Sequence, residues 1–276
     1  MLRRLVSAVA TAATRLSESR LFRETHFADT DPDGYHHPTP NDVFEVRKFL
    51  LHFIPAELAN IIIDEARYWP RVIAQQEMHV DVSASASPGN NAFLCYLVTP
   101  PIPTVEDLES PDVAPRVKMV RFTTLSCDQG WGGLEPDRNT YNGSWTWFEA
   151  AIFRPTQPGA AQSERVWLRH ALEGPVEFPR IGYRSGIEVK NLVDGESHWQ
   201  VQRNVTASNL LKEHTVVWVA DDLAAEPELV NNGSGDGAGF VNLLSPGDSI
   251  AVIARAQYPG WVNRVRQVDV LVYYAV

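Results

Sequence analysis

The chain has 276 residues, of which 44% are hydrophobic and 21% are charged, an ordinary globular composition with ample material for a core. Its 34 acidic and 24 basic residues give a formal net charge of −10 at pH 7. So acidic a chain, without a run of Lys or Arg, repels a phosphate backbone, and we expect no nucleic-acid partner. No apolar run reaches the roughly 18 residues of a membrane-spanning helix, so we expect no transmembrane segment.

The cysteines and histidines point away from disulfide and metal chemistry. Cys95 and Cys127 are too few for a disulfide framework, and the eight histidines form no HxH, HExxH or Cys/His grouping. We therefore expect no metal, no cofactor and a reducing, cytoplasmic location. Three Asn-x-Ser/Thr triplets, beginning at Asn142, Asn204 and Asn232, are the opposing signal, because such triplets can carry glycans in secreted proteins.

Residues 1–22 have four arginines and apolar residues at helical spacing, which predicts an amphipathic N-terminal helix. The same features are typical of a mitochondrial presequence, so a mitochondrial location is the alternative to the cytoplasm. Residues 23–42 are rich in Asp, Pro, Thr and His and lack periodicity, which predicts a linker or extended arm.

Residues 43–75 read as a helical hairpin. Phe44, Phe49 and Phe53 fall along one helical stripe, and Pro55 then opens "PAELANIIIDEARYW" as a first-turn proline. Pro70 ends the pattern, because proline cannot continue a helix.

Residues 76–276 have β-type runs separated by Gly, Pro, Asn and Asp clusters, with no helical period between them. The last run alternates clearly, with Val268, Val270 and Val272 on one side. About ten short strands predict a mainly β fold, an antiparallel β-sandwich or barrel. The expected strands are "MHVDVSAS", "AFLCYLVT", "RVKMVRFTTLS", "SWTWFEAAIF", "RVWLRHALE", "HWQVQRNV", "EHTVVWVA", "FVNLL", "DSIAVIARAQY" and "VRQVDVLVYYAV".

The stretch "SCDQGWGGLEPDRNTYNGSWTWFEA", residues 126–150, reads as a strand, a loop and a returning strand. Pleating places Trp145, Trp147 and Glu149 on one side of the returning strand. Both sides are apolar, so we expect a central strand in which Glu149 is neutralised by a basic neighbour such as Arg255.

The loops of this region supply the candidate ligand site. Asp128, Gln129, Trp131, Tyr141 and Asn142 would present donors, acceptors and an aromatic plate at one end of the sandwich, as a glycan or peptide site requires. The connection "YPGWVNRV" adds Trp261, Asn263 and Arg264. We predict that Trp131 and Trp261 lie at the same end; the alternative is that both rings fill corners of the fold.

Catalytic motifs are absent from the sequence. No GxSxG elbow, P-loop or GxGxxG precedes a helix. Asp128 and Glu149 are a candidate carboxylate pair for glycoside hydrolysis, which needs a separation of about 5 to 9.5 Å.

Several motifs carry a family resemblance: "SCDQGWGG", "TYNGSWTWFEA", "WQVQRNVTAS", "VVWVADD" and "YPGWVNRVRQVDVLVYYAV". Over residues 54–276 the chain resembles an uncharacterised fungal protein family with a C-terminal GWVNxV…VxVYYAV β-domain. That resemblance implies an architecture and no assigned chemistry. More remotely, the β-region is similar to galactose-binding-like jelly rolls, including the substrate-binding domains of some F-box proteins.

The segment "FIPAELANIIIDEARYWPRV" also resembles the first helices of an F-box, which implies an adaptor of a ubiquitin ligase. The chain departs from that pattern at Ile54, where leucine is usual, and after Trp69, where β-structure is expected. The leading hypothesis is a non-catalytic recognition or protein-interaction module. The alternatives are an F-box-like adaptor and a glycoside-active jelly-roll enzyme.

Overall fold

The computed structural model describes residues 37–108, 114–154, 175–177, 195–221 and 231–276. The chain divides into two compact units. The first comprises Met1–Arg71, Val105–Arg116 and Tyr273–Val276, and the second Val72–Thr104 and Val117–Val272. The helix predicted over 1–22, most of the arm predicted over 23–42 and the predicted strand "RVWLRHALE" lie outside the described residues.

Helices α2 (Pro40–Leu50) and α3 (Ala56–Glu65) belong to the first unit. Thr39 caps α2: its hydroxyl accepts a hydrogen bond from the Asp42 backbone N–H at 3.2 Å, and the Asp42 carboxylate accepts one from the Thr39 N–H at 2.8 Å. This capping box, with proline in the first turn, starts the helix at Pro40. The last three residues of the predicted arm are therefore helical.

The helical hairpin is shorter than predicted, because α3 ends at Glu65 and strand β1 already begins at Arg71. After α3, the Trp69 indole donates a hydrogen bond to the Asp64 carboxylate at 2.8 Å, and Pro70 prevents further helix. The two helices enclose a small core of Val43, Leu50, Ala59 and Ile63.

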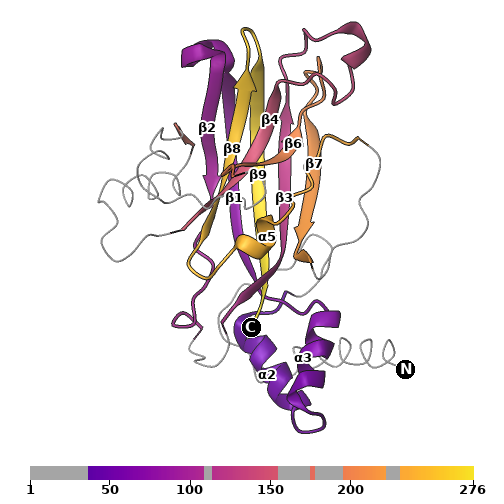
Figure 1. The fold of residues 1–276 in the computed structure, drawn as a ribbon, viewed down its shortest axis with the longest axis vertical. Coiled ribbons are helices and arrows are strands. Elements are labelled where there is room, and N and C mark those ends of the chain that lie inside the picture. The colour runs from indigo at the N-terminus through magenta and orange to yellow at the C-terminus, as the bar shows by residue number, and fades with distance from the viewer. Residues whose placement is uncertain (1–36, 109–113, 155–174, 178–194, 222–230) are drawn as a thin grey trace. The chain divides into compact units, whose positions relative to one another are not determined.

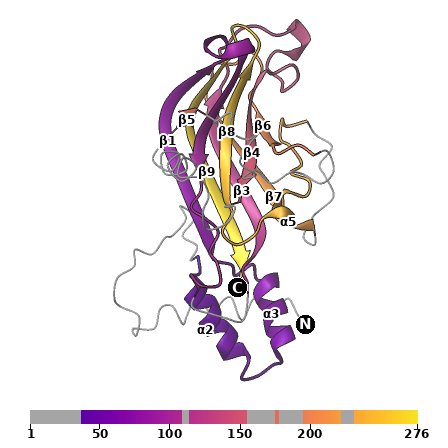
Figure 2. The same cartoon turned by 60° about the vertical axis from the view of Figure 1, so that its left-hand side comes forward.

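Nine strands of the described residues form the sandwich (Figures 1 and 2). One sheet has the order β1-β9-β3-β7 and the other β5-β2-β8-β4-β6. Their bounds are β1 Arg71–Ser83, β2 Asn91–Val98, β3 Arg116–Cys127, β4 Thr146–Phe153, β5 Val176–Glu177, β6 Trp199–Arg203, β7 Lys212–Val219, β8 Ser249–Gln257 and β9 Val262–Ala275.

The strand order is that of a jelly roll. If the two-residue β5 is set aside, successive strands alternate between the sheets, except that β4 and β6 pair with each other. This is the double Greek-key arrangement of eight strands in two sheets. The predicted antiparallel β-sandwich is confirmed.

Strand alternation builds the core between the sheets. Phe148 and Ile152 of β4, with Val268 and Val270 of β9, lie in the main hydrophobic core, as the alternation in their sequences predicted. The other face of β4 is also apolar: Ala151 belongs to a second buried cluster.

One predicted strand is wrong. "FVNLL" contains the short helix α5 (Phe240–Leu243), because a brief apolar run does not by itself distinguish a strand from a buried helical turn. Phe240 is fully buried and touches the rings of Trp199 and Trp218 edge-on. In the described part of the chain, no helix is long and apolar enough to cross a membrane.

Candidate functional site

Four strand connections meet at one end of the sandwich, which we call the loop end (top of Figure 1). They are residues 84–90, 128–145, 204–211 and 258–261. Backbone hydrogen bonds join them: Ala84 N to Trp261 O at 3.0 Å, Asp128 N to Ser208 O at 3.2 Å, Thr206 N to Thr140 O at 2.8 Å, and Tyr258 N to Asn90 O at 2.8 Å. The loops therefore support one another.

Trp131 and Trp261 both lie at the loop end, as predicted. A Cβ atom at Gly260 would lie 2.7 Å from Cη2 of Trp131, and one at Gly132 would lie 3.8 Å from Cζ2 of Trp261. The two rings have different environments: Trp131 is 61% exposed, whereas Trp261 is 8% exposed and belongs to the main core. Gly260 has φ +85°, so glycine provides both the turn and the room for Trp131.

Asp128 and Gln129 point into the protein. The Asp128 carboxylate, with no exposed surface, accepts hydrogen bonds from the backbone N–H groups of Gly130 at 2.8 Å and Ala207 at 2.6 Å. Burial raises the pKa of Asp128, although these bonds act to lower it. The Gln129 side chain accepts from the Val262 N–H at 3.0 Å and donates to the Trp131 carbonyl. These two side chains hold the loops together, and neither is presented to a ligand.

Asn263 lies in a buried polar network between the sheets. Its oxygen accepts from the Asn204 amide at 3.0 Å, and its own amide donates to the Trp147 carbonyl at 3.0 Å. Asn204 also accepts from the Ser126 hydroxyl at 2.7 Å and donates to the Thr146 hydroxyl at 3.0 Å. Because Asn204 is fully buried, the triplet that it begins is not accessible to glycosylation in the folded chain.

Tyr141 joins a third polar group. Its hydroxyl accepts a hydrogen bond from the Lys212 ammonium at 2.8 Å and shares one with Nε2 of His214 at 3.0 Å. Burial and the nearby Lys212 charge lower the pKa of His214 to about 4, so the imidazole is neutral at pH 7. Asn142 is tied to its surroundings through its carbonyl, which accepts from Thr206 at 2.7 Å.

Arg264 is directed toward strand β1. Its Nε lies 3.9 Å from the Asp81 carboxylate, and its side chain is 39% exposed. The structure therefore brings Asp128, Gln129, Trp131 and Trp261 together. Arg264 lies apart from them, on strand β9 and facing Asp81 of strand β1.

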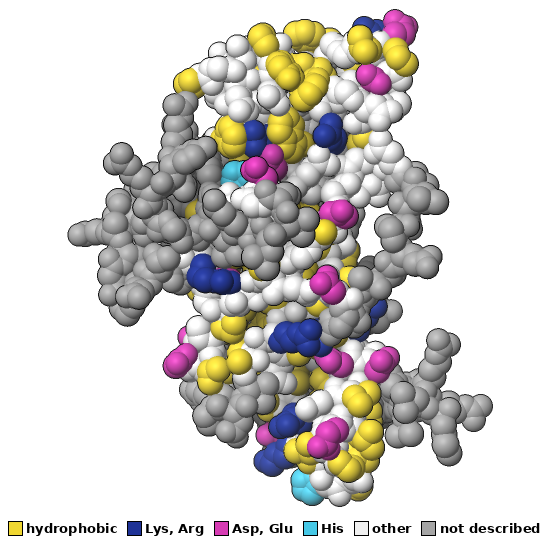
Figure 3. Space-filling view, viewed as in Figure 1, with side chains coloured by type: hydrophobic (Ala, Val, Ile, Leu, Met, Phe, Trp, Pro, Cys, Tyr) yellow, Lys and Arg dark blue, Asp and Glu magenta, His cyan; other side chains and the backbone are white. Residues whose placement is uncertain are grey.

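The loop end also exposes apolar side chains that were not predicted as site residues. Trp145 and Tyr258 meet in an edge-on contact with centroids 4.5 Å apart, and both are partly open to solvent. Leu134, Leu210 and Leu211 are also exposed. Figure 3 shows hydrophobic side chains gathered over this end. Leucines within turn sequences were the available signal, because polar residues are the usual choice there.

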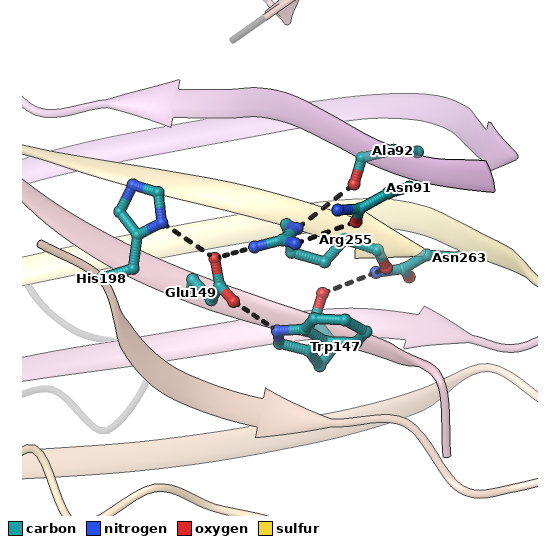
Figure 4. Close-up of polar contacts among 7 residues, drawn as sticks. All are labelled: Asn91, Ala92, Trp147, Glu149, His198, Arg255 and Asn263. Atoms are coloured by element: carbon teal, nitrogen blue, oxygen red, sulfur yellow. Dashed lines mark hydrogen bonds and ion pairs between the residues drawn. The ribbon is translucent and has the colours of Figure 1, made fainter. Parts of the chain in front are cut away.

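A cluster of charged and aromatic side chains around Glu149 and Arg255 lies on the outer face of the five-stranded sheet (Figure 4). The Arg255 guanidinium donates to the Glu149 carboxylate and, at 3.1 Å, to the Asn91 side chain. Its Cζ lies 3.3 Å from the centroid of the Phe93 ring and 4.9 Å from that of Trp147. The predicted pairing of Glu149 with Arg255 is confirmed.

Glu149 has two further partners. The Trp147 indole donates to one carboxylate oxygen at 2.7 Å, and Nδ1 of His198 lies 3.3 Å from the other. Burial would raise the pKa of Glu149, but the His198 hydrogen bond, the Arg255 charge and the Trp147 bond outweigh it, so the pKa lies below its ordinary value. The carboxylate is therefore ionised at neutral pH.

The described residues contain no group of three or more His, Cys, Asp or Glu side chains placed to hold a metal ion. Cys95 and Cys127 are both buried thiols. Burial raises the pKa of each thiol, which leaves both protonated and weakly nucleophilic.

The sequence matches no protein-family model and no curated protein. Among solved structures, a decameric BFDV capsid protein is similar, with 11% sequence identity and a TM-score of 0.25 over 75% of this chain and 98% of the capsid protein. A TM-score this low carries no argument about function. The jelly-roll assignment comes from the strand order itself.

Proposed function

We propose that this chain is a non-catalytic recognition module that binds a protein partner through the loop end. The observation that carries the proposal is a set of exposed apolar side chains on loops that are tied together by hydrogen bonds: Trp131, Leu134, Trp145, Leu210, Leu211 and Tyr258. Exposed aromatic residues on a rigid support bury much area with little loss of conformational freedom, which favours protein recognition.

A protein partner suits this surface better than a glycan. A glycan site combines an aromatic plate with convergent polar groups that bond to sugar hydroxyls. Here Asp128, Gln129 and Asn263 are buried and bond to the protein itself. The apolar surface around Trp131 is therefore the main feature left for a ligand.

The enzyme alternative has less support. General acid catalysis of glycoside hydrolysis needs a carboxyl group that stays protonated beside a second carboxylate. Glu149 has a lowered pKa and an arginine partner, and Asp128 is buried beneath the loops. Membership of the fungal family, an F-box-like adaptor role and a cytoplasmic location remain proposals that depend on the sequence resemblances and composition.

Affinity purification from an extract of the native source, followed by mass spectrometry, tests the proposal. The bait would be the full chain, beside Trp131→Ala and Tyr258→Ala variants. Val217→Ala is a matched control, because Val217 is also an exposed apolar residue but lies on strand β7. We expect a protein that the wild type and the Val217 variant capture and both loop-end variants lose.

Two outcomes would contradict the proposal. A partner retained by both loop-end variants would place binding elsewhere on the chain. A captured glycoprotein that free sugar releases would show that the ligand is a glycan.

A further inference from the structure

The aromatic side chains of the loop end keep hydrogen-bonding groups that the fold does not use. Elsewhere in the described residues, the indole N–H groups donate to protein oxygens: Trp69 to Asp64, Trp147 to Glu149, Trp199 to the Ala238 carbonyl and Trp218 to the Gly235 carbonyl. Four loop-end side chains have polar tips without a hydrogen-bond partner among the described residues: Trp131, Trp145, Tyr258 and Trp261. The first three are exposed, so their tips are available to a ligand.

The three exposed rings gather around the turn at residues 258–261. Trp145 meets Tyr258 edge-on, with centroids 4.5 Å apart and ring planes at 88°. The Trp131 ring lies against Gly260, where an added Cβ atom would be 2.7 Å from Cη2. Tyr258 and Gly260 are two residues apart in the chain, so their Cα atoms are at most about 7 Å apart. Trp131 and Trp145 therefore contact the same short turn and belong to one aromatic surface.

Tyr258 adopts a strained backbone conformation in this turn. Its φ is +71°, in the left-handed region that glycine and asparagine enter readily and a bulky residue rarely does. The conformation is held by the Tyr258 N–H, which donates to the Asn90 carbonyl at 2.8 Å, and by the Gly260 N–H, which donates to the Ser85 hydroxyl at 2.9 Å. The ring is 46% exposed, so it fills no core position in return. Strain of this kind is concentrated at binding sites.

The loop end has little charge. The charged residues of its four connections are Asp128, Glu135, Asp137 and Arg138. Asp128 is fully buried, and the other three lie within one short stretch, residues 135–138. The surface around the turn at 258–261 therefore offers apolar ring faces and indole groups, which can donate a hydrogen bond but cannot accept one. A ligand that complements it is uncharged and supplies hydrogen-bond acceptors.

We propose that the loop end binds a proline-rich segment of its protein partner in the polyproline II conformation. Proline has no backbone N–H, and the carbonyls of this helix have no partner within it, so the segment offers acceptors beside apolar rings. Trp131 and Trp145 would stack on proline rings and donate to these carbonyls. One turn of the helix rises about 9 Å, the same order as the extent of the turn that both indoles contact. This inference rests on the proposed function, because it names the class of partner for the same surface.

Calorimetric titration of the full chain with a synthetic decaproline peptide tests the inference. A Gly-Ser peptide of equal length is the control, because it is a flexible coil and not a preformed helix. We expect decaproline to bind with a dissociation constant below about 1 mM and the Gly-Ser peptide not to bind. Trp131→Ala and Trp145→Ala should each raise the dissociation constant about tenfold, since exposed aromatic anchors dominate such contacts. Val217→Ala, on strand β7, should leave it unchanged.

Two further variants separate a binding role from a structural one. Trp131→Phe keeps a ring and removes only the N–H, so it should raise the dissociation constant about threefold, less than Trp131→Ala does. Tyr258→Asn removes the ring but suits the left-handed turn, because asparagine tolerates that conformation. It should weaken decaproline binding about tenfold while the thermal transition stays at or above that of the wild type.

Three results would overturn the inference. The first is an absence of decaproline binding up to about 1 mM. The second is binding that the Trp131, Trp145 and Tyr258 variants all retain, since the peptide would then occupy another surface. The third is equal binding of the Gly-Ser peptide, which would remove any preference for the polyproline II helix.

The capture experiment judges the proposed function separately. A captured protein that Trp131→Ala loses supports the proposed function even where decaproline fails to bind, and only the proline-rich inference is then wrong. A captured protein that the loop-end variants retain contradicts the proposed function whatever the peptide does.

Discussion

Two of the regions in which the sandwich buries polar side chains satisfy them in different ways. Beneath the loop end, neutral amides and hydroxyls of Asn204, Asn263 and Ser126 bond to one another and to the backbone. On the outer face of the five-stranded sheet, a full ion pair of Glu149 and Arg255 lies between aromatic rings. Neutral groups that bond to one another cost little to bury, whereas a buried charge is tolerated only while its partner remains.

Removing one partner of the Glu149–Arg255 ion pair should therefore cause the largest loss of stability. We expect Glu149→Ala to lower the free energy of unfolding by about 3–5 kcal/mol, because the Arg255 charge would stay buried without its partner. Urea denaturation of the variant beside the wild type measures this change.

A double variant provides the control. Replacing Glu149 with Gln and Arg255 with Met removes both charges and should restore much of the lost stability. If Glu149→Ala costs less than about 0.5 kcal/mol, the range of ordinary surface sites, the carboxylate is not a structural partner of Arg255.

The sequence predicted this pair and much of the fold for definable reasons. Alternation in residues 144–153 and 265–276 identified the faces of β4 and β9, and Arg255 was the charge that interrupted an apolar run. The strand predicted for "FVNLL" was wrong because four apolar residues around one asparagine fit a strand or a helical turn equally well. The hydrogen-bond partners of Asp128 and Asn263 could not be predicted from the sequence. Ala207 and Asn204 are distant in the chain, and only the order of the strands brings them into contact with Asp128 and Asn263.

His214 should produce the next largest effect, as a dependence of stability on pH. Its pKa of about 4 in the folded chain lies below the ordinary value of about 6.5, so the unfolded chain binds a proton more readily. The stability that this group contributes is complete above about pH 7 and is lost as the pH falls from about 6.5 to 4. The total loss should be roughly 3 kcal/mol.

The His214→Gln variant isolates this contribution from that of the carboxylates. The neighbours that bear on the ring are the Lys212 ammonium and the Tyr141 hydroxyl, and both remain in the variant. We expect the difference in unfolding free energy between wild type and variant to fall steadily across this pH range. A difference that stays constant with pH would mean that His214 does not titrate as a buried base.

A smaller loss of stability is expected from a substitution in the buried network of the neutral residues Ser126, Asn204 and Asn263. Asn263→Ala should cost about 1–3 kcal/mol, because it removes the acceptor of one Asn204 amide N–H and the side-chain donor to the Trp147 carbonyl in a buried site. Urea denaturation measures the change, and it should remain below that of Glu149→Ala. If Asn263→Ala proved as costly as Glu149→Ala, an unpaired neutral group would cost as much stability in this fold as an unpaired buried charge.

The smallest effect on stability should come from Trp131, which has the most exposed aromatic ring of the loop end. Its ring lies on Gly260 but remains 61% exposed, so Trp131→Ala removes little buried area and should change the free energy of unfolding by less than about 0.5 kcal/mol. Iodide should quench a smaller fraction of the tryptophan fluorescence in the variant. The variant loses an accessible indole, whereas buried tryptophans such as Trp261 and Trp218 remain. A loss of more than about 2 kcal/mol would show that the ring is a structural part of the loops, and its surface could not then be assigned to a partner on grounds of exposure.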